Sequence, residues 1–130
     1  MIHIKIITPQ GLYKESDVEA VHVRSVEGEM TILPHHTPLV AMLETCKLQL
    51  MNYGVYKNYA LAGGMLHFQD DQAKILTDAI EGQEEIDIER AHRSKERAEQ
   101  RLEKKDSGTN IKRAQVALAK AINRINVYGK

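Results

Sequence analysis

The spacing of apolar residues changes once along this chain, near Ile86, and this change constrains the fold more than any other feature of the sequence. Before it, apolar and polar residues alternate in short runs, as at Ile2, Ile4 and Ile6, which is the period of a half-buried strand. After it, apolar residues recur every three or four positions, which is the period of a helix. We therefore expect a β-structured part followed by a helical part.

Turn residues divide the first part into short strands. The segments Pro9-Gln10-Gly11, Asn52-Tyr53-Gly54 and Asp70-Asp71-Gln72 each separate two apolar runs. No stretch is long enough to supply the crossover helices of a parallel sheet, so antiparallel strands in a sandwich or flattened barrel are predicted. Gly63-Gly64 lies between two apolar runs and predicts a bulge, a bend or a close backbone approach. A phosphate-binding role for these glycines is disfavoured because no helix follows them.

The second part predicts two helices, one from about Asp87 to Lys104 and one beginning at Ile111. The apolar stripe of the second helix comprises Ile111, Ala114, Leu118, Ala121, Ile122 and Ile125. The first helix has a thinner stripe of Ile88, Ala91, Ala98 and Leu102. Turn and capping residues at 106–110 predict an antiparallel hairpin between them. Because few large apolar side chains are available, the hairpin is expected to need a surface to dock on.

Composition narrows the possible functions. The net charge is zero, but the segment from Ile111 onward contains five basic residues and no acidic residue, which suits either a solvated helix face or an anionic partner. The single cysteine, Cys46, predicts a reducing compartment. No apolar run approaches the roughly 18 residues that span a bilayer, and the first residues do not resemble a signal peptide, so a soluble cytoplasmic protein without membrane insertion is expected.

The sequence contains no pattern typical of an enzyme or of a metal site. Its six histidines lie on scattered segments without an adjacent nucleophile and orienting group. His35-His36 has no cysteine or carboxylate at ligand spacing, which disfavours a metal site. A small adaptor that binds nucleic acid or an acidic protein through the basic last helix is the alternative, although the balanced charge and the scarcity of aromatic residues argue against nucleic acid.

Three ordered segments resemble the epsilon subunit of bacterial F-type rotary ATP synthases. They are Gly28 to Val40 (GEMTILPHHTPLV), Ala62 to Leu66 (AGGML) and Ile86 to Ala91 (IDIERA). The resemblance covers essentially the whole chain, and it implies an antiparallel β-sandwich of about ten strands over residues 1–84 and a regulatory helical hairpin over residues 85–130.

The resemblance also implies a function and partners. The chain is expected to be a non-catalytic subunit of the central stalk in a proton-translocating ATP synthase, peripheral to the cytoplasmic side of the membrane and without a required cofactor. Glu29 would face the c-ring and His36 the gamma subunit. The hairpin would act as a brake on ATP hydrolysis when it extends toward the catalytic beta subunits. Thr31 and His35 depart from the family, which often has glycine at both positions, so strain follows wherever φ is positive.

Some family members from bacilli resemble ATP sensors built on an Ile/Leu-Asp-x-x-Arg-Ala motif, which this chain has at Ile86 to Ala91. Carried over by position, the nucleotide-binding candidates are Glu81, Ile86, Asp87, Arg90, Ala91, Arg97, Lys120 and Arg124. Guanidinium groups suit phosphate oxygens, whereas Lys120 stands where ATP-binding members have arginine and would bind more weakly. The alternative interpretation of the motif is a helix start at which Asp87 caps the backbone amides.

Overall fold

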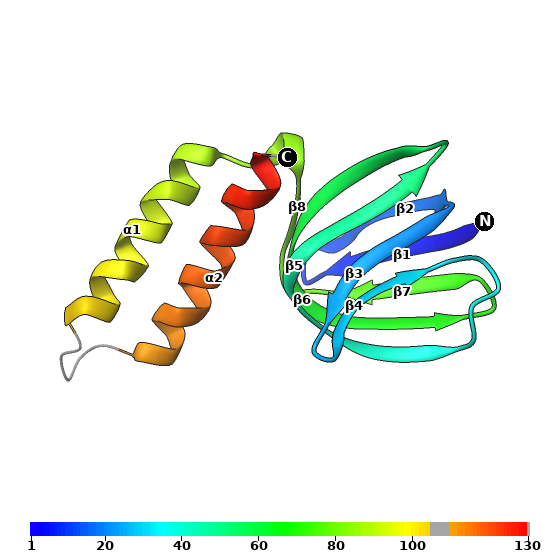
Figure 1. Ribbon diagram of the computed structural model, residues 1–130, viewed down its shortest axis with the longest axis horizontal. Coiled ribbons are helices and arrows are strands. Elements are labelled where there is room, and N and C mark those ends of the chain that lie inside the picture. Colours follow the sequence, from blue (N-terminus) through cyan, green and yellow to red (C-terminus); the bar gives the residue numbers. More distant parts are fainter. Residues whose placement is uncertain (105–109, 130) are drawn as a thin grey trace. The chain divides into compact units, whose positions relative to one another are not determined.

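A computed structural model describes residues 1–104 and 110–129 of the chain. The chain divides into two compact units, Met1–Gly82 and Gln83–Lys130. The first unit contains every strand and the second contains every α-helix of the described residues, so the expected order of a β part and a helical part is confirmed (Figure 1). Within those residues, neither helix is long and apolar enough to cross a membrane.

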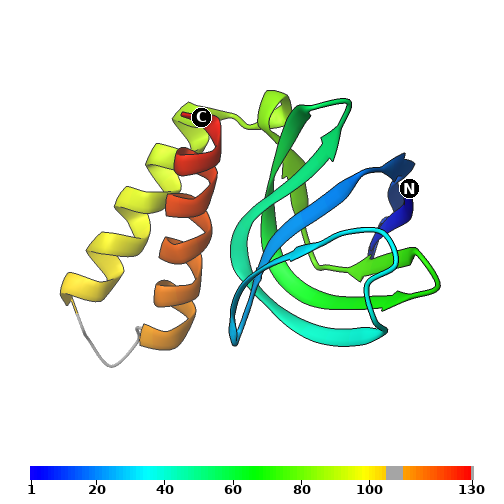
Figure 2. The ribbon, with the colours of Figure 1, turned by 45° about the vertical axis from the view of Figure 1, so that its right-hand side comes forward.

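Eight strands form the first unit. They are β1 (Ile2–Thr8), β2 (Gly11–Val18), β3 (Ala20–Ser25), β4 (Gly28–Ile32), β5 (Leu39–Asn52), β6 (Val55–Gln69), β7 (Gln72–Leu76) and β8 (Ile80–Gly82). The pairing order is β2-β1-β7-β6-β5-β3-β4, and β8 pairs with β6. This single sheet curls over so that its two halves enclose one core (Figure 2).

The expected number of about ten strands is wrong, because the two longest strands each run through both halves of the curled sheet. The pairing of β5 with β6 omits one pair, Glu44 with Gly63, between Leu43↔Gly64 and Thr45↔Ala62, and the register is the same on both sides. Gly63 and Gly64 have φ values of +82° and +133°, which only glycine adopts at low cost, so the predicted bend is confirmed. Before the bend β6 pairs with β8, and after it with β7.

The expectation of purely antiparallel pairing is also wrong at one place. Strands β1 and β7 are parallel, with Ile4 opposite Ala73 and Ile6 opposite Ile75, whereas every other pair among the described strands is antiparallel. No crossover helix is needed because the chain returns to β1 through five intervening strands. The argument from missing helices excluded only a local parallel connection.

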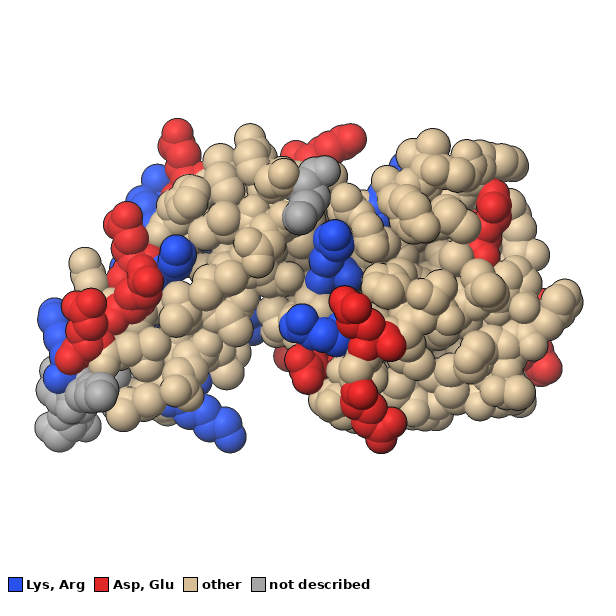
Figure 3. Space-filling model, in the orientation of Figure 1, with Lys and Arg blue, Asp and Glu red and all other residues tan. Residues whose placement is uncertain are grey.

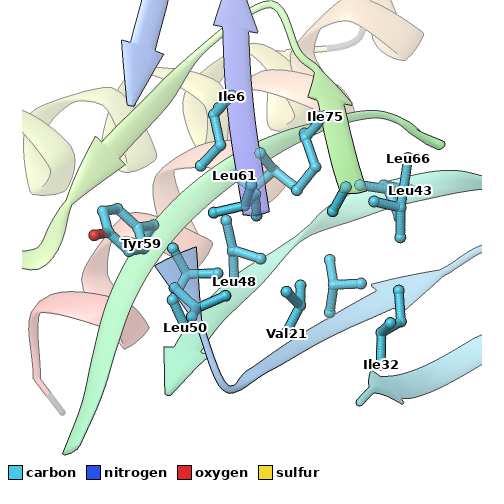
Figure 4. Close-up of a cluster of buried hydrophobic side chains, with 14 of the residues drawn as sticks. Ile6, Val21, Ile32, Leu43, Leu48, Leu50, Tyr59, Leu61, Leu66 and Ile75 are labelled. Carbon is cyan, nitrogen blue, oxygen red and sulfur yellow. The ribbon is translucent and has the colours of Figure 1, made fainter. Parts of the chain in front are cut away.

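Alternating residues build the core of the sandwich. Ile2, Ile4 and Ile6 of β1 are fully buried, as their spacing predicts. They pack with apolar side chains from both halves of the sheet (Figure 4); among the labelled residues are Val21, Ile32, Leu43, Leu48, Leu50, Tyr59, Leu61, Leu66 and Ile75. The core of this unit is therefore made of its own residues, as an independently folding domain requires.

The second unit is an antiparallel helical hairpin, as expected. A short 3₁₀ turn at Gln83–Glu85 precedes α1 (Ile88–Lys104), and α2 follows (Ile111–Tyr128). The Gln83 Nε2 group donates to the Tyr128 carbonyl oxygen at 3.3 Å, which joins the entry of the hairpin to its end. Asn110 caps α2 by accepting from the Arg113 amide at 3.0 Å. The predicted turn residues 106–109 lie outside the described residues.

Alanine dominates the buried surface of the hairpin. Ala91 and Ala98 of α1, and Ala114 and Ala121 of α2, are buried at seven-residue spacing on each helix. The larger members of the predicted α2 stripe are not covered to the same extent, since Ile111 is 45% and Ile122 is 39% exposed. Small alanines let the helices approach closely, which leaves broad side chains at the rim of the contact. The hairpin therefore buries little apolar area for its length.

Candidate docking and nucleotide-binding residues

The two residues expected to contact the rotor lie on β4 and in the loop that follows it. Glu29 lies at the start of β4, opposite Arg24 in the register, and its side chain is 71% exposed. His36 lies in the loop between β4 and β5, where its ring makes an edge-to-face contact with Phe68 at a centroid distance of 6.0 Å. The structure therefore places Glu29 near the first residue of β4 and His36 in the loop beyond its last residue, Ile32.

The two family departures in this region behave differently. Thr31 lies within β4 and has no positive φ, so it adds no backbone strain. His35 has φ +68°, in the left-handed region that a non-glycine residue rarely occupies. The strain expected from a missing glycine is thus present at His35 alone. Asp71 contacts His35 directly, and the sequence identified Asp71 only as part of a polar turn.

The candidate nucleotide residues begin at the start of α1, where Asp87 acts as a helix cap. Its Oδ1 atom accepts from the Arg90 amide at 3.1 Å, and its carbonyl oxygen accepts from the Ala91 amide at 3.0 Å. The capping interpretation of the motif is therefore confirmed. Ala91 is buried against α2, which gives this motif residue a packing role.

Helical geometry brings the four basic candidates together on one side of the hairpin. Arg90 and Arg97 are two turns apart on α1, and each directly precedes a buried alanine. Lys120 and Arg124 are one turn apart on α2 and half-buried. In an antiparallel pair these edges of the two helices lie on the same side, so helical geometry predicts that the four cations face a common region. The side-chain Nη2 of Arg97 also donates to Ser94 Oγ at 3.3 Å.

The remaining nucleotide candidates are less accessible. Ile86 is buried, with 6% of its surface exposed. Glu81 lies on β8 opposite Ala60 of β6, in the first unit of the chain, and is half-buried. The other candidates belong to the second unit, so only they can be described as one cluster.

Charge is distributed differently on the rest of the hairpin. The face of α1 that points away from α2 carries acidic and basic side chains side by side, as Figure 3 shows along the edge of that helix. Such mixed pairs at helical spacing favour a solvated surface. The cationic side with Arg90 and Lys120 is thus the part of the hairpin most suited to an anion.

A cluster of one histidine and two carboxylates on the sandwich, the His3 cluster, was not predicted from the sequence. His3 of β1 lies between two carboxylates of β2, with Nε2 at 2.6 Å from Glu15 and Nδ1 at 2.8 Å from Asp17. The hydrogen bonds with Asp17 and then Glu15 raise the pKa of His3, and the bond with His3 lowers the pKa of Glu15. The sequence could have indicated this cluster only if both strands had shown clear alternation of apolar and polar residues. Strand β2 has little apolar periodicity, so the pairing of His3 with Glu15 and Asp17 was not predicted.

Cys46 and the metal-binding residue types add no further site among the described residues. Burial raises the pKa of the Cys46 thiol, which makes it a poor nucleophile. Among residues 1–104 and 110–129, no three histidine, cysteine or acidic side chains are arranged to hold a metal ion. The described residues thus combine a sandwich with an exposed loop and a weakly packed hairpin with a cationic side.

Comparison with known proteins identifies the class to which this architecture belongs. Residues 1–83 match the family model of the ATP synthase delta/epsilon chain β-sandwich domain, and residues 84–129 match that of its long α-helix domain. The chain therefore belongs to the ATP synthase delta/epsilon chain family. The two matches cover almost the whole chain in the order of its two units.

Individual relatives narrow this class to the epsilon type. The chain is 42% identical to the ATP synthase epsilon chain of Halalkalibacterium halodurans, covering 99% of this chain and 98% of the relative. It is 42% identical to the ATP synthase epsilon chain of Bacillus velezensis, covering 98% and 97%. The resemblance to bacterial epsilon subunits is thereby confirmed, and the alternative of an unrelated adaptor has no support.

Solved structures agree with this assignment. A chain of the Euglena gracilis mitochondrial ATP synthase (OSCP, F1 and c-ring, rotational state 1) superposes with a TM-score of 0.84 at 25% identity, over 99% of this chain and 81% of that chain. A chain of the Tetrahymena thermophila mitochondrial ATP synthase central stalk and c-ring has a TM-score of 0.60 at 12% identity, covering 98% and 93%, and supports the fold alone.

Proposed function

We propose that this chain is a non-catalytic subunit of the central stalk in a bacterial ATP synthase, peripheral to the cytoplasmic side of the membrane. The observation that carries this proposal is the end-to-end match of both units to epsilon chains. The sandwich docks on the gamma subunit and the c-ring, and the hairpin reaches the catalytic beta subunits. No cofactor is required for this role.

The docking surface of the sandwich includes the loop that carries His36 and the exposed end of β4 that carries Glu29. The exposed Glu29 carboxylate suits a polar group of the ring, and the His36 ring is held beside the buried Phe68. These residues lie on a rigid scaffold with its own core, so docking does not need the hairpin.

A test of this division uses a chain ending at Gly82, where the first unit ends. We expect the truncated chain to bind purified gamma subunit with nearly the affinity of the full chain, measured by calorimetry, since the docking residues and their core are retained. Circular dichroism checks that the sandwich is folded. A folded sandwich that fails to bind gamma contradicts the proposed division of roles.

The hairpin is the regulatory element in this proposal. Its helices bury mainly alanines, so the contact between them is weak. Another protein surface can therefore compete by packing against the partly exposed Ile111 and Ile122. Extension toward the beta subunits restrains ATP hydrolysis, and attraction between the basic α2 and an acidic partner surface assists it. This assistance is expected to weaken as salt concentration rises.

ATP is the proposed regulatory ligand that favours the folded hairpin. Arg90, Arg97, Lys120 and Arg124 offer cations from both helices on one side, so a polyphosphate bound there would tie the helices together. Asp87 contributes by capping α1, which fixes the start of the helix beside this cluster. Lysine at position 120 makes a single-point contact and lowers the affinity relative to arginine.

Differential scanning fluorimetry with ATP tests this ligand assignment. We expect millimolar ATP to raise the melting temperature of the wild-type chain without being hydrolysed, and Arg90→Ala to remove that rise. Arg93→Ala is the matched control, because Arg93 is an exposed arginine of the same helix outside the proposed cluster. Absence of a shift in the wild-type chain would exclude ATP sensing and leave the brake untouched.

A further inference from the structure

The loop between β4 and β5 contains a strained turn next to the proposed docking residue. The His36 amide donates to the Leu33 carbonyl oxygen at 3.2 Å, which closes a four-residue turn. Pro34 occupies its second position and His35, with φ +68°, its third. This is the pattern of a type II turn, whose third position normally requires glycine. Histidine at this position needs compensation from its surroundings.

Asp71 supplies that compensation from the turn between β6 and β7. Its Oδ1 atom accepts from the His35 amide at 2.6 Å, and its Oδ2 atom lies 3.3 Å from His35 Nδ1. One carboxylate therefore engages both the backbone and the ring of the strained residue. Such bonds to an ionised acceptor are stronger than bonds between neutral groups.

Asp71 is itself held in place by the sheet. Its backbone has φ +59° in the two-residue turn that joins β6 and β7, and its carbonyl oxygen accepts from the His3 amide at 2.9 Å. The carboxylate thus belongs to the folded scaffold, and the loop lies beside this turn at one end of the sandwich (Figures 1 and 2).

The next residue of the loop is the one proposed to contact the gamma subunit. The His36 ring packs against Phe68, three residues before Asp71, and its Nδ1 atom lies 2.7 Å from the Thr37 carbonyl oxygen. The turn at His35 determines the direction in which the chain enters His36. A loop released from Asp71 would let His35 leave the left-handed region and change that direction.

We propose that Asp71 is a positioning residue for gamma docking, which holds the strained His35 turn so that His36 faces its partner. The role is specific to chains with a side chain at position 35, since glycine would adopt the same turn without help. This inference rests on the docking function proposed above. The β6–β7 turn would thus affect binding of the gamma subunit without contacting it.

The first test measures the turn in the isolated full-length chain. We expect amide exchange at His35, followed by NMR, to become at least about tenfold faster in Asp71→Ala, because the bond to a charged acceptor is lost. Asp70→Ala is the matched control: Asp70 has φ +53° in the same turn, so alanine there carries a similar backbone cost without touching His35. Unchanged exchange in Asp71→Ala overturns the inference.

The second test measures affinity for purified gamma subunit by calorimetry. Asp71→Ala is expected to weaken binding by about tenfold, and Asp70→Ala by less than about threefold. Asp71→Asn retains an acceptor oxygen and is expected to recover most of the affinity. In a His35→Gly background the effect of Asp71→Ala falls below about threefold, because glycine adopts the turn unaided.

The two tests separate this inference from the function on which it depends. Equal gamma affinities for Asp71→Ala and Asp70→Ala overturn the positioning role, as does an equal loss from Asp71→Ala with histidine or glycine at position 35. A wild-type chain whose His35 amide is protected by Asp71 but which does not bind gamma overturns the docking function, and with it the role of Asp71 in docking.

Discussion

Replacement of Gly64 by alanine tests the bend that lets one sheet form both halves of the sandwich. A Cβ atom on Gly64 would lie 2.1 Å from the Leu76 carbonyl oxygen and 3.1 Å from Thr77 Cα. Both are backbone atoms, so no side chain can rotate away, and the end of β7 has to move by roughly 1 Å to restore ordinary contact. The φ of +133° adds a backbone cost for any residue with a Cβ atom.

Gly28 provides the matched control for the size of the effect. It has a nearly identical φ of +130°, but nothing lies within 4 Å of the point that a Cβ atom would occupy there. Gly28→Ala therefore incurs only the backbone cost, about 1–3 kcal/mol. Gly64→Ala incurs that cost and a steric cost of about 2 kcal/mol from overpacking. The difference between the two variants isolates the close approach of β6 to β7.

Urea unfolding followed by tyrosine fluorescence measures this difference. Four of the five tyrosines (13, 53, 56 and 59) lie in the sandwich, so the signal reports mainly on that unit. With a slope of about 1 kcal/mol per M for a unit of this size, the midpoint of Gly64→Ala is expected about 2 M below that of Gly28→Ala. Equal midpoints would refute the reasoning, because the backbone cost would then explain both.

Two further predictions concern the His3 cluster and the hairpin. Because Asp17 and Glu15 raise the pKa of His3, protonated His3 stabilises the fold below its ordinary pKa of 6.5, and this stabilisation is lost as pH rises through the raised pKa. His3→Gln should abolish this pH dependence of the melting temperature. An unchanged pH profile in His3→Gln would contradict the assignment. Ala121→Leu places a larger side chain in the fully buried contact between the helices and should destabilise the hairpin by about 1–3 kcal/mol, as measured by amide exchange. Ala119→Leu, at an exposed position of the same helix, is the control and should have little effect.

Local chemistry explains why parts of the site were predictable. Asp87 and Asn110 cap helices through bonds to residues three positions ahead, and such bonds depend only on neighbouring sequence. The glycine pair at 63–64 marks a bend because only glycine has the required backbone freedom. The contact between His35 and Asp71 spans 36 positions and could not be recognised from either segment alone.

Although β2 has little apolar periodicity, the sequence alone was enough to predict a β-structured part followed by two helices, because the period of apolar residues follows directly from strand and helix geometry. It also determined the helix caps and, through ordered motifs, the family. Three features became evident only in the folded chain: β1 pairs in parallel with β7, alanines rather than isoleucines fill the hairpin contact, and Asp71 contacts His35. These features depend on packing between residues that are distant in the chain. Which segments pair is decided by the packing of the whole core, so no single segment reveals it.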